Sequence, residues 1–252
     1  MILSHAVHVL PRKEDLDTTR LAGKVVVVLD ILFATTTMVA ALAAGAREIV
    51  PVLNEAAARE EGARLAARPG PDGRVPDVLL AGELDAKTLG GFAPPTPIRL
   101  LAHGVAGKTI VHTTTNGTVA MRSTEGADAV YAGALVNGEA LVDHVLAAHP
   151  DQELLIVCSG STGNFNLEDF TGAGYLVELL ARRLGDAADW SDAARAARAV
   201  FRSAPPERLL QDSRVGCMVE RLGWTDETLY SARLSSHALV PRLQDGRLVA
   251  VA

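Results

Sequence analysis

Short apolar runs rich in β-branched residues alternate with alanine-rich stretches along most of the chain. Four of these runs lie within 24–30, 108–117, 128–138 and 153–166, and each leads through small polar residues into a segment of helical composition. The first, KVVVVLD, continues through ILFATTT into MVAALAAGA. Continuous apolar runs are typical of strands covered on both faces, and their alternation with helices favours a parallel sheet. The pattern therefore predicts an α/β fold with a largely parallel sheet.

The C-terminal third follows a different pattern. Residues 186–222 predict two helices separated by the sequence APPE, and PRLQDGRLVAV at 241–251 predicts a hairpin with Asp245 and Gly246 at its turn. Residues 75–83 predict one further strand before this region. Since no long linker interrupts the chain, we expect residues 1–252 to form a single α/β domain with a helical C-terminal addition.

Composition and charge exclude several classes of protein. The net charge of −6 gives no basic footprint for nucleic acid. The apolar run VVVVLDILFA is broken by Asp30 and is shorter than the ~18 residues of a membrane span, and the first residues lack the order of a signal peptide. Only Cys158 and Cys217 are present, without a paired motif, which fits a reducing compartment. We expect a cytoplasmic protein that binds neither nucleic acid nor membrane; the sequence leaves a homo-oligomer open.

Candidate chemistry gathers in the loops that follow the predicted strands. Parallel sheets bind ligands at the carboxyl ends of their strands. Four acids would meet at that edge, namely Asp30, Glu83, Glu168 and Asp169. Carboxylates are the ligands that Mg²⁺ prefers, and loops rich in hydroxyls and free N–H groups suit phosphate. The candidate substrate-binding residues are Thr35, Thr36, Thr113, Thr114, Thr115, Asn116, Gly117 and Ser161. The set predicts Mg²⁺-assisted chemistry on a small phosphorylated molecule, with Asp30 or Asp169 orienting the attacking water.

Each of these residues also has a simpler interpretation. Asn166 and Asp169 stand three apart before an apolar helix, which is the spacing of an N-terminal cap, and acids in a first helical turn favour the helix dipole. For Glu168 and Asp169 taken alone, capping is the stronger interpretation. Asp30 is harder to explain in this way, because an acid inside an apolar run costs burial energy unless something compensates it. His112, at a strand end, is a candidate substrate contact or proton shuttle.

The motifs together resemble those of the 2-phosphosulfolactate phosphatase family. The resemblance rests on VVVVLDILFATTTMVAAL, AGE, HTTTNGTVAM and CSGSTGNFNLEDFTGAG, which follow one another in the family's order, and on ALVPRLQDGRL near the end. It implies a three-layer α/β/α fold with a largely parallel or mixed sheet and a Mg²⁺-dependent phosphatase that converts 2-phosphosulfolactate to sulfolactate and phosphate, a step toward coenzyme M. By the same resemblance, Asp30, Glu83, Glu168 and Asp169 fall on acidic positions of the family, and 113–117 on its Thr-Asn-Gly loop.

The chain departs from this family at three positions where arginine is usual. Phe33, Leu84 and Val119 stand there instead. Arginine donates paired hydrogen bonds to oxyanions, and each charge-assisted contact is worth about 1.5–3 kcal/mol. The departures predict a less anionic ligand than phosphosulfolactate. The competing hypothesis is a non-catalytic or altered-substrate binding protein on the same scaffold.

Overall fold

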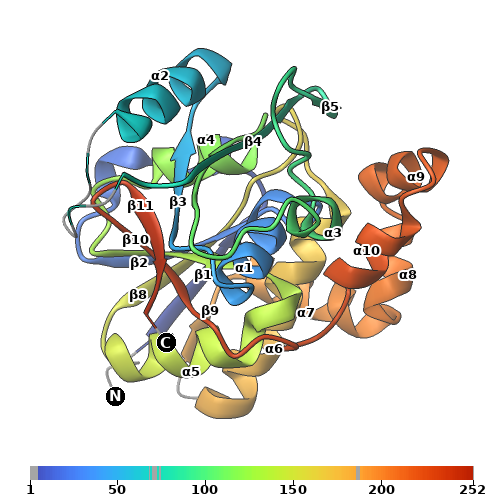
Figure 1. The fold of residues 1–252 in the computed structure, drawn as a ribbon. Coiled ribbons are helices and arrows are strands. Elements are labelled where there is room, and N and C mark those ends of the chain that lie inside the picture. The colour runs from blue at the N-terminus through green and yellow to red at the C-terminus, as the bar shows by residue number, and fades with distance from the viewer. Residues whose placement is uncertain (1–4, 68, 70–72, 74, 186–187, 252) are drawn as a thin grey trace.

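A computed structural model describes residues 5–67, 69, 73, 75–185 and 188–251 (Figure 1). The strands are β1 (His5–Leu10), β2 (Lys24–Leu29), β3 (Glu48–Val52), β4 (Val78–Leu84), β5 (Lys87–Thr88), β6 (Thr109–Thr113), β7 (Ala129–Gly133), β8 (Glu153–Cys158), β9 (Ala188–Trp190), β10 (Pro241–Gln244) and β11 (Arg247–Ala250). The α-helices are α1 (Ala34–Ala43), α2 (Glu55–Ala66), α3 (Pro97–Leu101), α4 (Gly117–Ser123), α5 (Gly138–Ala148), α6 (Leu167–Leu184), α7 (Asp192–Ser203), α8 (Pro206–Gln211), α9 (Arg214–Arg221) and α10 (Thr225–Ser231). Short 3₁₀ turns follow at η1 (Lys13–Asp15), η2 (Thr18–Arg20) and η3 (Leu135–Asn137).

One mixed sheet joins the eleven strands in the order β5-β4-β6-β3-β11-β10-β7-β2-β8-β1-β9. Two groups of strands are parallel within themselves, β4-β6-β3 on one side and β7-β2-β8-β1-β9 on the other. The hairpin β10–β11 lies between these groups and is antiparallel to β7 and to β3. The prediction of an α/β fold with a mixed, mostly parallel sheet is confirmed.

Strand β2 shows why the apolar runs form the centre of this sheet. It pairs along its length with β7 on one side and β8 on the other. Val25, Val27 and Leu29 share a core with apolar residues of α5 and α6, whereas Val26 and Val28 share another with residues of α1 and α4. Because successive side chains of a strand point to opposite faces, a strand covered by helices on both faces needs an unbroken apolar run.

The C-terminal region confirms the hairpin and corrects the helices. Asp245 and Gly246 have φ of 49° and 73°, as a two-residue turn with left-handed central residues requires. The prediction of two helices in 186–222 was wrong, because the described part of this range holds β9 and the three helices α7, α8 and α9. The extra break follows α8, where the Ser213 hydroxyl accepts a hydrogen bond from the Gly216 N–H (2.9 Å) and begins a new helix.

The remaining exclusions concern membranes and cysteines. In the described ranges, no helix combines the length and the apolar composition that crossing a bilayer would need. Cys158 is buried at the end of β8 and Cys217 is exposed on α9, and both are free thiols.

Candidate active site

A cavity of about 300 Å³ lies where the loops after β2, β4, β6 and β8 meet α9. Seven of the predicted site residues line it: Asp30, Glu83, Thr114, Thr115, Asn116, Ser161 and Glu168. The other five are buried and do not line it: Thr35, Thr36, Thr113, Gly117 and Asp169. The fold therefore brings three of the four acids to one cavity at the predicted edge of the sheet.

Asp30 ends the run of β2 and faces this cavity. Its Oδ1 accepts a hydrogen bond from the N–H of Ala34 (3.1 Å), the first residue of α1. Its Oδ2 lies against Gly117, where a Cβ would come within 2.6 Å of that oxygen, so only glycine lets α4 begin this close to the carboxylate. Burial, together with the negative charges of Glu83 and Glu168, raises the pKa of Asp30 to about 7.

Thr35 and Thr36 shape the turn that presents Asp30. The Thr35 hydroxyl oxygen accepts a hydrogen bond from the Asp30 N–H (2.9 Å), and the Thr36 hydroxyl donates to the carbonyl of Ile31 (2.9 Å). Both side chains are fully buried. Their hydroxyls hold the backbone of this turn and do not line the cavity.

Asp169 joins two loops behind the cavity wall. Its Oδ1 accepts from the N–H of Ile31 (2.8 Å) and its Oδ2 from the N–H of Gly160 (3.1 Å). Its own N–H donates to Oδ1 of Asn166 (3.3 Å), which confirms the predicted cap. Burial raises the pKa of Asp169 well above its usual range, and the neighbouring Asp30 and Glu168 carboxylates act in the same direction. This carboxylate fixes the loops after β2 and β8 relative to each other.

Glu168, the adjacent residue, is equally buried but has no such partners. Its side chain lines the cavity, the residue is 1% exposed, and neither carboxylate oxygen has a hydrogen-bond partner. Burial raises the pKa of Glu168 above its ordinary value, although the Ser213 hydroxyl and the Arg214 charge act to lower it; the Ser213 hydroxyl itself donates to the carbonyl of Leu210. A buried polar group without a partner costs about 1–3 kcal/mol, and more when it is charged. A cation or a hydrogen-bond donor that binds in the cavity would remove this cost by giving the carboxylate a partner.

Glu83 holds the threonine-rich loop that follows β6. Its Oε1 accepts from the N–H of Thr115 (2.7 Å) and its Oε2 from the N–H of Ala86 (2.7 Å). Within the described part of the chain, no group of three or more His, Cys, Asp or Glu side chains is arranged to hold a metal ion. The acids therefore form a set in which Asp30 and Glu168 are the ligand candidates, while Glu83 and Asp169 are occupied by backbone N–H groups.

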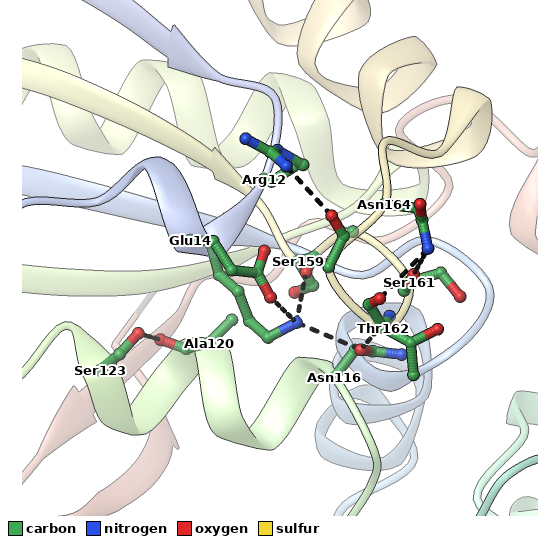
Figure 2. Close-up of polar contacts among 12 residues, drawn as sticks. Arg12, Glu14, Asn116, Ala120, Ser123, Ser159, Ser161, Thr162 and Asn164 are labelled. Atoms are coloured by element: carbon green, nitrogen blue, oxygen red, sulfur yellow. Dashed lines mark hydrogen bonds and ion pairs between the residues drawn. The ribbon is translucent and has the colours of Figure 1, made fainter.

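Two cations that the sequence does not single out lie beside these loops, Arg214 in the cavity lining and Lys13 outside it. Lys13 donates from Nζ to the Asn116 side-chain oxygen (3.2 Å) and to the carbonyl of Ser159 (3.1 Å), and so ties η1 to both loops. The two acceptor residues, Asn116 and Ser159, are labelled in Figure 2. Arg214, the first residue of α9, lines the cavity and donates to the hydroxyl of Ser161. Neither residue stands in a recognisable motif, and no local spacing links them to the strand-end loops.

Some of the other residues singled out in the sequence line the cavity and others do not. Of the three positions at which the resemblance implies arginine, Phe33 lines this cavity, and Leu84 lines a neighbouring groove and is 59% exposed. Val119, half-buried on α4, is not among the described residues that line either space. His112 is buried with both ring nitrogens unpartnered and away from the cavity lining, and burial lowers its pKa to about 4.

Comparison with known proteins identifies the family of the chain. Residues 10–246 match the model of a family described as 2-phosphosulpholactate phosphatase. A protein of Deinococcus radiodurans named "Probable 2-phosphosulfolactate phosphatase" is 39% identical over 88% of each chain. Proteins with the same name from Carboxydothermus hydrogenoformans and Symbiobacterium thermophilum are 37% and 36% identical, over 90% and 91% of this chain and 90% and 95% of their own. The chain belongs to the 2-phosphosulfolactate phosphatase family.

Proposed function

We propose that the protein is a Mg²⁺-dependent phosphoric monoester hydrolase that acts on a small phosphorylated organic acid. The observation that carries this proposal is Glu168, a buried carboxylate that lines the cavity with both oxygens unpartnered. The names of the relatives support a phosphate ester as the substrate.

The donor set fits one Mg²⁺ ion. Mg²⁺ usually takes one or two protein carboxylates and completes its coordination with waters and substrate phosphate, so a group of three protein ligands is not needed. Asp30 and Glu168 would hold the ion. When bound, Mg²⁺ neutralises charge on the phosphoryl oxygens and makes a water molecule more acidic.

The chain's own residues would position the substrate and the water. Arg214 and the hydroxyl of Ser161 line the cavity and can donate to phosphate oxygens, whereas the Thr115 hydroxyl donates to Glu83 (3.2 Å). Asp30 would accept a proton from the attacking water as the water oxygen bonds to phosphorus. The P–O bond to the organic group then breaks, and the leaving oxygen takes a proton from solvent. Asp169 and Glu83 act as positioning residues, because their oxygens already accept from backbone N–H groups.

The test measures phosphate release from 2-phosphosulfolactate and 2-phospholactate with Mg²⁺ and with a chelator. We expect Mg²⁺-dependent release that Glu168→Gln reduces by about a hundredfold or more, because one ligand of the ion is lost. Glu153→Gln is the matched control, since Glu153 lies at the other end of β8 and pairs with Lys24. Release that persists in chelator, or a fully active Glu168→Gln, would overturn the proposal.

The second candidate is a binding protein without turnover, favoured by Phe33 in the cavity wall where the family has a cation. The same samples distinguish it. A saturable rise of the melting temperature with Mg²⁺ and no phosphate release from either ester would support a binding role, because a ligand that binds only the folded state must stabilise it.

A further inference from the structure

We infer that the substrate carries an uncharged apolar group of about one ring in size, bound against a wall made by α9, an inference that rests on the proposed hydrolase function. The phosphate would lie at the strand-end loops, and the apolar group would fill the other part of the same cavity. At about 300 Å³ the cavity is near the lower end of the range for small-molecule sites. A single ring or a branched alkyl group attached to a phosphorylated acid fits that size.

The first support is the apolar stripe of α9. Val215, Met218 and Val219 of α9 and Leu222, the capping residue that follows it, stand at positions i, i+3, i+4 and i+7, and all four line the cavity. Side chains at this spacing share one face of a helix. In an ordinary surface helix such a face packs on the core, whereas here it also forms a cavity wall, and Leu222 remains 48% exposed.

The second support is the facing surface. Leu32 and Phe33, from the turn after β2, and Pro94 and Pro95, from the connection before α3, complete the apolar part together with Trp224. Figure 1 shows α8, α9 and α10 grouped at one side of the molecule, and the acids reach the cavity from the strand ends instead. The apolar lining therefore comes mainly from α9, Trp224 and the proline connection, while the turn after β2 supplies both Asp30 and the apolar Leu32 and Phe33.

The third support is that this wall is held in place before any ligand binds. Glu227 of α10, fully buried, accepts hydrogen bonds from the Thr96 hydroxyl (2.6 Å), the Ile98 N–H (2.8 Å) and the Arg99 guanidinium (2.7 Å). The same guanidinium lies 4.5 Å from the centre of the Trp224 ring. These contacts join α10 and Trp224 to residues 96–99, which directly follow Pro94 and Pro95. An apolar group can therefore bind without first ordering this part of the wall.

Charge argues against a second strong anion in this part of the cavity. Arg214 is the one lysine or arginine among the described lining residues, against the carboxylates of Asp30, Glu83, Asp85 and Glu168. A sulfonate placed against Val215, Met218, Val219 and Leu222 would lose its hydration beside apolar side chains, and the one lining cation, Arg214, is the residue assigned above to the phosphate, so this placement is costly. An apolar group there gains roughly 0.8 kcal/mol for each CH₂ that it buries.

The test compares three esters that differ only at the third carbon: 2-phospho-3-phenyllactate, 2-phospholactate and 2-phosphosulfolactate. We expect kcat/KM to be at least tenfold higher for the phenyl ester than for phospholactate, and lowest for the sulfonate. A sulfonate ester that is the best substrate, or a phenyl ester no better than phospholactate, would overturn the inference and leave the hydrolase proposal standing.

Variants locate the effect on α9. Leu222→Asp should lower kcat/KM for the phenyl ester about tenfold more than it lowers kcat/KM for phospholactate, since the added charge repels both anionic esters but only the ring also loses its apolar contact. Leu229→Asp is the matched control, because Leu229 is 45% exposed on α10 and lies outside the cavity lining. Phe33→Arg should raise the rate for the sulfonate relative to the phenyl ester. Equal effects of the two aspartate variants would contradict a role for α9.

Binding separates failure of the inference from failure of the hydrolase proposal. If none of the esters releases phosphate, calorimetry with 3-phenyllactate and lactate still tests the wall. Tighter binding of phenyllactate that Leu222→Asp weakens and Leu229→Asp does not would support the wall and refute the hydrolase. Absence of binding by phenyllactate would overturn the wall as well.

Discussion

Two buried glutamates, Glu168 in the cavity lining and Glu227 on α10, are held in opposite ways. Glu227 is fully buried and accepts hydrogen bonds from a hydroxyl, two backbone N–H groups and a guanidinium. Glu168 is 1% exposed and accepts none. The first is a structural joint between α10 and α3. The second is a cavity-lining carboxylate without a hydrogen-bond partner, and this difference, rather than burial itself, is why Glu168 and not Glu227 is the candidate metal ligand.

The largest expected loss of stability is that of a substitution at Glu227. Glu227→Ala should lower the free energy of unfolding by about 3 kcal/mol, because it leaves the Thr96 hydroxyl and the Ile98 N–H without their acceptor and the Arg99 guanidinium without a buried partner. Urea unfolding of the variant measures this loss. A loss below about 1 kcal/mol would mean that water or other acceptors replace the carboxylate.

A third glutamate, Glu178, is held by arginines, and its contribution to stability depends on pH. Burial acts to raise its pKa, but hydrogen bonds from Arg202, Arg198 and Arg182 outweigh burial and lower it from 4.5 to about 2. Because the folded state holds the ionised form, its stabilisation is complete above about pH 4.5 and disappears as the pH falls toward 2.

Glu178→Gln removes this dependence. The difference in unfolding free energy between wild type and variant should be on the order of 1–2 kcal/mol at pH 6, reduced by the exposure of the arginines, and should shrink between pH 4.5 and pH 2. Denaturant titrations at several pH values measure it. A difference that stays constant across this range would show that the arginines do not stabilise the ionised form.

The smallest expected effect on stability is at Glu168, and it has the opposite sign. Without metal, Glu168→Gln should raise the free energy of unfolding by about 1 kcal/mol, because an amide is cheaper to bury unpaired than a carboxylate. Melting temperatures with chelator, and then with Mg²⁺, measure both the gain and the lost response to the ion. A destabilised variant in chelator would indicate that the carboxylate has an internal partner.

The sequence could predict the strand ends and their acids because both are local. An apolar run followed by Asp30, and a cap pattern around Asp169, are properties of neighbouring residues. The different roles of Glu168 and Asp169 could not be predicted in this way, since consecutive helical residues point in directions about 100° apart and only the packed fold decides which one reaches the cavity.

The apolar wall is harder to predict from the sequence than the strand ends. The spacing of Val215, Met218, Val219 and Leu222 predicts an amphipathic helix, and by itself such a face is expected to pack on the core. Its place beside the β2 turn depends on contacts between segments far apart in the chain, such as that of Arg214 with Ser161. Likewise the terminal hairpin is predictable from its turn, but its insertion between β3 and β7 is not.

That insertion has a consequence for biosynthesis. Because β10 and β11 follow every other strand in the chain, the sheet cannot become continuous until all the others have emerged from the ribosome. Glu83 and Thr115 come from one parallel group, whereas Asp30 and Glu168 come from the other. The nascent chain therefore carries two half-sheets with exposed inner edges until the hairpin closes the gap between them. These long-range pairings favour slow folding, and the waiting edges are where a chaperone would be expected to bind.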